Sequence, residues 1–217
     1  MSLRPPRSVG LVIADATAMI REYEKWGELM EMDLFTVYGH EAKVYVKGGL
    51  TFVPRYGSSF SYEGVLESVL AEFPGGEPEY VVLVSGGNDL YGPEQDVFAE
   101  EAENVNVALG IVKVAVRLWY QRIPCLLVVG ASSEVFKYRG EKARVFDRRV
   151  QYTLRVARSM MAAVPLGGCK LVSGAEELAA MSAGDIVDGM GHFGGPRAYR
   201  KFLYAVSQWV GEVPAWC

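Results

Sequence analysis

A short segment near the end of the chain carries the residue types of an acid–base pair. Asp185, Asp188 and His192 stand close together there, and His192 is one of two histidines in the sequence. A carboxylate beside an imidazole can orient the ring and stabilise its protonated form, as a general base requires. The other histidine, His40, falls between a predicted helix and strand, and we interpret it as structural.

Glycine pairs and one amide supply candidate hydrogen-bond donors elsewhere in the chain. Gly48-Gly49 and Gly86-Gly87 allow tight turns with outward-pointing N–H groups, and Asn88 adds a side-chain amide. Donors that converge on one point, together with an Asp/His pair, are the parts of an acyl-transfer site. Gly86-Gly87 could also cradle a phosphate, but no glycine-rich nucleotide motif accompanies it, so we rank that reading low.

These residues must be positioned by the regular elements, which alternate along the whole sequence. Strand-length apolar runs alternate with helical patterns, which predicts a parallel sheet with helices on both faces. The predicted strands cover residues 8–13, 42–46, 80–84, 124–129 and 170–172. The predicted helices cover residues 18–30, 59–73, 97–120, 141–163 and 195–210.

Functional loops of such a sheet lie at the carboxyl ends of its strands. This rule selects residues 14–17, 48–49, 86–89 and 131–133, and the segment 185–192 is expected to reach the same edge. We predict one α/β domain over residues 1–217, a three-layer α/β/α sandwich with five parallel strands in the order 2-1-3-4-5. The first residues could be a cloning remnant, and the domain could be cut from a longer protein.

In this order, the loop residues resemble the SGNH (GDSL-like) hydrolases, a superfamily of esterases with a flavodoxin-like sheet. The first family block, Gly-Asp-Ser, corresponds to Ala14-Asp15-Ala16, and a glycine block corresponds to Gly48 or Gly49. The third block, Gly-x-Asn-Asp, is matched by residues 86–89. The last block, Asp-x-x-His, corresponds to Asp188 through His192 with one extra residue.

The resemblance implies a role for each matched residue. His192 would be the general base and Asp188 its orienting carboxylate, with Asp185 as the alternative because of the extra residue. The oxyanion hole would use the N–H of residue 16, the N–H of Gly49 (Gly48 as alternate) and the amide of Asn88. Asp15 would brace the loops.

The nucleophile position is occupied by Ala16, which has no group that can attack a carbonyl. Either a serine was replaced deliberately, which we favour because the rest of the site is retained, or the chain is a natural pseudoenzyme. Thr17 could be a displaced nucleophile, although a residue at the start of a helix more often caps it.

The resemblance therefore implies a serine esterase that acts on small carboxylic esters, such as an acetylated sugar, a lipid ester or a thioester, and is inactive with Ala16. Apolar loop residues could line an acyl pocket: Tyr91, Phe136, Tyr138, Met190 and Phe193. The alternative is a non-catalytic binding or interaction module on the same fold, such as a domain of a retrotransposon-encoded protein.

The overall composition and charge limit the classes of binding partner that we expect. The net charge of −4 gives no support for nucleic-acid binding, and we interpret Arg144, Arg148 and Arg149 as a solvated helix face. No apolar run is long enough to cross a bilayer and no signal peptide is recognised, so we expect an intracellular protein. Three cysteines argue against a disulfide framework, and we expect buried, inert thiols at Cys125 and Cys169. We expect no metal and no cofactor.

Overall fold

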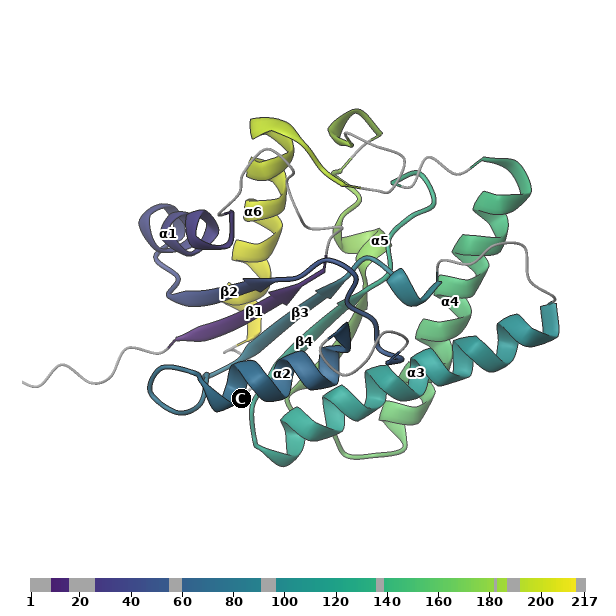
Figure 1. The fold of residues 1–217 in the computed structure, drawn as a ribbon, viewed down its shortest axis with the longest axis horizontal. Coiled ribbons are helices and arrows are strands. Elements are labelled where there is room, and N and C mark those ends of the chain that lie inside the picture. Colours follow the sequence, from purple (N-terminus) through teal and green to yellow (C-terminus); the bar gives the residue numbers. More distant parts are fainter. Residues whose placement is uncertain are drawn as a thin grey trace, which may run out of the picture.

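A parallel β-sheet forms the centre of the molecule (Figure 1). The computed structural model describes residues 9–15, 26–54, 60–90, 97–135, 139–181, 183–186 and 192–213. Within these residues, five strands pair in the order β2-β1-β3-β4-β5, so the predicted fold class and strand order are confirmed. The strands are β1 Gly10–Ala14, β2 Ala42–Val46, β3 Val81–Ser85, β4 Cys125–Val129 and β5 Cys169–Ser173.

The apolar runs of the sequence explain which strands lie in the middle. Every residue of β1, β3 and β4 is buried, because helices cover both faces of these central strands. The outer strands β2 and β5 bury only some of their positions. All neighbouring strands are parallel, and their carboxyl ends therefore share one edge of the sheet.

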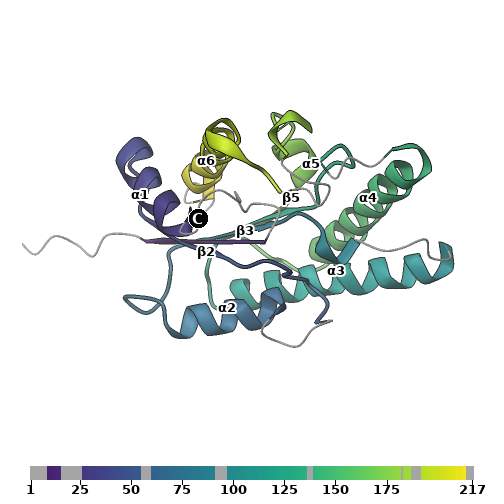
Figure 2. The ribbon, with the colours of Figure 1, turned by 45° about the horizontal axis from the view of Figure 1, so that its top comes forward.

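Helices form the two outer layers (Figures 1 and 2). The helices of one layer are α1 Trp26–Tyr38 and α6 Gly195–Glu212, with the short α5 Gly174–Glu177 nearby. The other layer contains α2 Tyr62–Ala71 and α3 Val97–Tyr120, and α4 Gly140–Ala162 packs against α3 and β5. Two 3₁₀ turns, η3 Asn88–Leu90 and η4 Ala183–Asp185, lie in loops.

Local sequence signals account for the helix starts nearest the loops of interest. Ser61 caps α2, because its hydroxyl accepts a hydrogen bond from the backbone N–H of Gly64 at 3.1 Å. Helix α6 has Pro196 in its first turn, where a missing N–H costs nothing. Its inner face packs Phe202 edge-on against Trp209, with ring centroids 6.2 Å apart.

The first helix differs from the prediction. Among the described residues α1 covers Trp26–Tyr38, so the helix continues beyond its predicted end at residue 30, and residues 18–25 of the prediction lie outside the described part of the chain. Residues 31–38 carry no clear helical signal in the sequence, because Met32, Phe35 and Val37 are all exposed and the helix lacks a clean apolar stripe.

The interpretation of one charged residue, Arg149, as part of a solvated helix face is wrong. Arg149 is 4% exposed and not part of a solvated face, because it donates to Glu103 and Asn104 between α4 and α3. Arg144 is exposed as expected and pairs with Glu141. His40 precedes β2 at the amino end of the sheet, which agrees with its structural interpretation. No helix among the described residues is long and apolar enough to cross a membrane.

Candidate active site

The loops selected from the sequence meet at the carboxyl edge of the sheet. The last residue of β1, Ala14, pairs with Val46 of β2 on one side and Val84 of β3 on the other. The segments that follow these strands therefore start side by side. They carry Asp15 after β1, residues 47–50 after β2, and residues 86–88 after β3.

Asp15 connects the first and third of these segments. Its side chain is fully buried, and its Oδ2 accepts hydrogen bonds from the backbone N–H of Gly86 at 2.8 Å and from Nδ2 of Asn88 at 3.3 Å. A buried carboxylate needs such donors, since an uncompensated charge is costly in the protein interior. The predicted bracing role of Asp15 is therefore confirmed.

Asn88 connects the segment after β3 to the segment after β2. Its Nδ2 also donates to the backbone carbonyl of Leu50 at 3.0 Å. Because Leu50 directly follows Gly49, this bond holds two of the expected oxyanion donors in adjoining loops. Gly49 has a φ of +75°, in the left-handed region that favours glycine, and Gly48 shares its turn.

Sequence reasoning missed the role of Asp89. This side chain is 1% exposed, and its two carboxylate oxygens accept hydrogen bonds from the backbone N–H groups of Phe52 at 2.6 Å and Val53 at 2.9 Å. Asp89 thus holds the far end of the loop that carries Gly48 and Gly49. The only signal in the sequence was its place directly after Asn88.

Tyr62 lies beneath the same junction. Its hydroxyl donates to the backbone carbonyl of Val84 at 3.0 Å, and its ring stacks on Phe52 with centroids 4.5 Å apart. Burial raises the pKa of Tyr62 well above its usual value of 10, and the negative charge of Asp15 raises it further. The phenol therefore stays protonated, and as a neutral donor it holds the end of β3 from which the loop begins.

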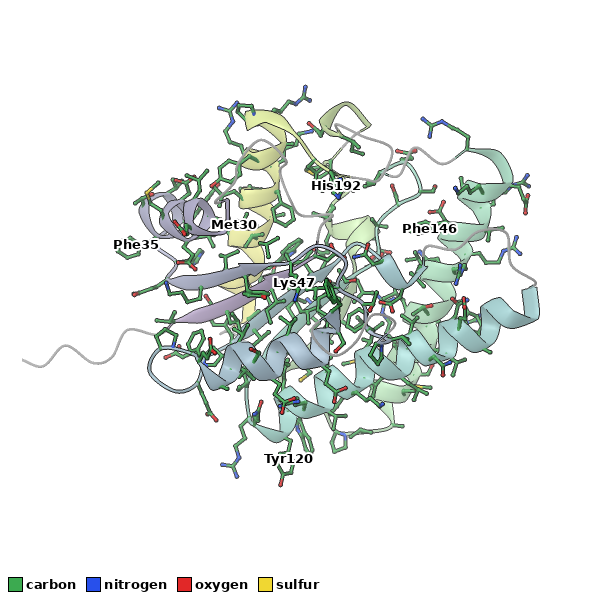
Figure 3. All side chains as sticks on the ribbon, in the orientation of Figure 1. Met30, Phe35, Lys47, Tyr120, Phe146 and His192 are labelled. Atoms are coloured by element: carbon green, nitrogen blue, oxygen red, sulfur yellow. The ribbon has the colours of Figure 1, made fainter. Side chains whose placement is uncertain are left out.

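The segment before α6 is closed by a short antiparallel bridge between Ile186 and Phe193. The backbone N–H of Gly194 also donates to the carbonyl of Asp185 at 2.9 Å. His192 directly precedes this bridge, and Figure 3 shows it beside the carboxyl ends of the strands. The bridge and the buried Phe193 ring thus fix the position of the backbone at His192.

Asp185 already has cationic partners. Its side chain is 3% exposed, Lys201 Nζ donates to it at 2.6 Å, and Arg197 Nε lies 3.8 Å away. Both cations come from the first turns of α6. The Asp185 carboxylate therefore neutralises charge at the start of that helix.

Several predicted site residues lie outside the described part of the chain: Ala16, Thr17 and Asp188, and the possible pocket residues Tyr91, Phe136, Tyr138 and Met190. The fifth proposed pocket residue is described, and its prediction is wrong. Phe193 is fully buried and packs against Phe202 with centroids 6.5 Å apart, so it belongs to the core.

A polar pocket of about 300 Å³ opens at the carboxyl ends of β4 and β5. Ser133, in the loop after β4, lines it; its hydroxyl and backbone N–H donate to the two carboxylate oxygens of Asp147, at 2.7 Å and 2.9 Å. The loop residues 131–133 are therefore held at the edge where the sequence placed them.

Comparison with known proteins establishes the fold. No family model and no curated protein matches the sequence. A family two carbohydrate esterase from Clostridium thermocellum superposes with a TM-score of 0.63 at 12% identity, over 99% of this chain and 66% of that one. A lipase from a goat rumen metagenome gives 0.61 at 11% identity, over 94% of this chain and 98% of that one.

A GDSL-like lipase from Bacteroides thetaiotaomicron VPI-5482 superposes with a TM-score of 0.53 at 15% identity, over 97% of this chain and 93% of that one. The chain has the fold of the GDSL-like hydrolases. At these identities the likeness extends to the fold alone, and the chain spans about two thirds of the carbohydrate esterase. In this GDSL-like fold, the junction of Asp15, Asn88 and Leu50 lies at the edge that carries the loops.

Proposed function

We propose that the chain is an SGNH-type serine esterase whose nucleophile position holds alanine, Ala16. The observation that carries this proposal is the junction in which Asn88 donates to both Asp15 and the carbonyl of Leu50. Three loops from three strand ends meet there, and residue 16 follows Asp15 directly in the chain. A nucleophile at that position would therefore start beside the amide of Asn88 and the turn at Gly49.

With serine at position 16, the reaction would proceed through an acyl-enzyme. The ring of His192 would take the hydroxyl proton while the oxygen attacks the ester carbonyl carbon, and Asp188 would orient the ring. The backbone N–H groups of residue 16 and Gly49 and the amide of Asn88 would stabilise the negative oxygen. The leaving alcohol would take the proton from His192, and water would then release the carboxylic acid by the same steps.

To act in the oxyanion hole, Asn88 would have to release one of the two acceptors that its amide now contacts. One amide N–H satisfies Leu50 at 3.0 Å, and the other makes the longer contact to Asp15 at 3.3 Å. The longer bond is the weaker one, so its hydrogen is the one for which a developing oxyanion would compete. Asp15 would keep the shorter bond from the backbone of Gly86 during this exchange.

Restoring the nucleophile tests the proposal. We expect Ala16→Ser to hydrolyse p-nitrophenyl acetate at least about 10³-fold faster than the unmodified chain, and to be labelled covalently by a fluorophosphonate. The matched control is Ala16→Ser combined with His192→Ala, which keeps the hydroxyl and removes the base. If a folded Ala16→Ser protein shows no turnover and is not labelled, the esterase assignment is wrong.

Two observations favour a second candidate, a non-catalytic ligand-binding module. Position 16 has no nucleophile, and both N–H groups of the Asn88 amide already have acceptors within the protein. A module would retain these contacts for the stability of its loops alone. An inactive Ala16→Ser protein with unchanged melting temperature would favour this candidate over the esterase.

A further inference from the structure

Two cysteines lie side by side at the amino ends of β4 and β5. Cys125 and Cys169 are the first residues of their strands and are direct partners in the parallel register. Partners of this kind point to the same face of a sheet. Both are free thiols, and they lie close enough for each to shift the pKa of the other. Cys169 Sγ in turn lies 3.6 Å from the carbonyl oxygen of Ala115 in α3.

The backbone spacing at this point suits a disulfide. Neighbouring strands lie about 4.8 Å apart, which falls within the Cα separations of about 4.4–6.8 Å that disulfides span. The bond would therefore need movement of the two sulfur atoms and little movement of the sheet. The strand start can adjust, because β5 is an outer strand of the described sheet and follows Gly168, whose φ is +81°.

The two thiols differ in access and in acidity. Cys125 is fully buried, whereas Cys169 is partly exposed. The neighbouring Cys125 thiol lowers the pKa of Cys169, while the neighbouring Cys169 thiol and burial raise the pKa of Cys125. Since the thiolate is the attacking species, Cys169 is the sulfur that meets an oxidant first.

We propose that Cys125 and Cys169 form a reversible dithiol–disulfide site that is oxidised by low-molecular-weight disulfides such as oxidised glutathione. The Cys169 thiolate attacks one sulfur of the oxidant, and one glutathione thiolate leaves. The Cys125 sulfur, after giving up its proton, attacks Cys169 in the mixed disulfide and expels the second glutathione. The two cysteines are oxidised, and one glutathione disulfide is reduced to two glutathione thiols.

This site is independent of the esterase proposal. The cysteines start their strands, whereas Asp15 and Asn88 follow the ends of theirs, so the two sites lie at opposite edges of the sheet. Oxidation would tie the outer strand β5 covalently to β4. Either proposal can fail without affecting the other.

The test uses the full chain with Cys217→Ser, which leaves these two cysteines. After incubation of the folded protein with oxidised glutathione, we expect that neither thiol can still be alkylated and that two molecules of reduced glutathione are released per chain. A non-reducing tryptic digest should join the peptides of residues 123–137 and 159–170, and dithiothreitol should separate them.

Single-cysteine controls distinguish this outcome from simple surface modification. With Cys125→Ala added, Cys169 should stop at the mixed disulfide with glutathione. With Cys169→Ser added instead, the buried Cys125 should remain unmodified in the folded protein. Glutathione that stays attached to Cys169 in the two-cysteine protein, or two thiols that remain fully alkylatable, would overturn the proposal.

Discussion

Asp89 binds the backbone of Phe52 through a 2.6 Å hydrogen bond from the Phe52 N–H to its Oδ2. The bond joins the loop after β3 to the loop after β2. The other oxygen of the same carboxylate accepts the N–H of Val53, so both oxygens are committed to one loop. Asp89 and Asn88, which are neighbours in sequence, therefore hold successive parts of the segment that begins at Gly48.

We predict that Asp89→Asn destabilises the protein by about 1–3 kcal/mol. The amide keeps one acceptor, but its NH₂ group would face a backbone N–H and leave that donor unsatisfied. Urea unfolding monitored by circular dichroism measures the change. Glu72→Gln is the matched control, because the exposed Glu72 side chain loses the same charge at the end of α2.

A stability loss in Asp89→Asn that equals the loss in Glu72→Gln would show that the carboxylate does not hold the loop. In the Ala16→Ser background, we also expect Asp89→Asn to lower kcat more than it raises KM. Displacing the Gly49 turn weakens donors that act in the transition state more than it weakens ground-state binding.

Asn88→Ala should affect both catalysis and stability. In an Ala16→Ser background we expect kcat to fall about 10²–10³-fold with little change in KM, because an oxyanion donor acts mainly in the transition state. The loss of its bonds to Leu50 and Asp15 should also lower the melting temperature.

Active-site titration with a fluorophosphonate separates these two effects of Asn88→Ala. It counts the molecules that still carry a reactive nucleophile, so kcat can be given per competent site. A normal kcat per titrated site together with a lower melting temperature would assign Asn88 to loop structure alone.

The sequence predicted the sheet well because its strands are continuous apolar runs bounded by turn residues. Residues 42–46 and 97–120 were predicted with their observed bounds. Helix α1 was predicted to end at residue 30 and continues to Tyr38, because exposed apolar side chains such as Phe35 obscure the apolar pattern of its second half. Propensity and periodicity carry no information about which apolar residues a fold leaves uncovered.

Contacts across the sheet could not be predicted from the same patterns. The burial of Arg149 depends on Glu103 and Asn104 in another helix, and the pairing of Cys125 with Cys169 depends on the register of two strands. The bracing role of Asp15 could be anticipated because a family motif specifies it. Asp89 stands beside the same motif, but its partners are backbone N–H groups that no sequence pattern marks.

Tyr62 should make stability depend on pH in the alkaline range. Its pKa is raised by burial and by Asp15, so above pH 10 the unfolded chain loses this proton while the folded chain keeps it. The free energy of unfolding should then fall, by up to about 1.4 kcal/mol per pH unit for this group. Tyr62→Phe should remove that part of the decline, measured by urea unfolding between pH 8 and pH 11.

Tyr120→Phe is the control for this measurement, because Tyr120 is 83% exposed. Its substitution should leave the alkaline slope unchanged. Identical slopes for the unmodified chain and Tyr62→Phe would show that the buried phenol ionises as readily as it does in the unfolded chain.

Matched substitutions in the Ala16→Ser background can show which carboxylate, Asp185 or Asp188, orients His192. Asp185 is buried and already paired with Lys201 at 2.6 Å, so Asp185→Asn should leave that lysine without its carboxylate and lower stability. Asp188→Asn should instead leave stability nearly unchanged and lower kcat by up to about 10⁴-fold, as expected for the carboxylate that orients a catalytic histidine.

The comparison of kcat with melting temperature decides between the two carboxylates. Lys201→Met combined with Asp185→Asn removes the ammonium left without its carboxylate, so it should recover part of the stability that Asp185→Asn loses. The same double substitution should leave kcat close to that of Ala16→Ser alone. A large fall in kcat in the double variant, with Asp188→Asn fully active, would make Asp185 the partner of His192 and assign Lys201 to the active site.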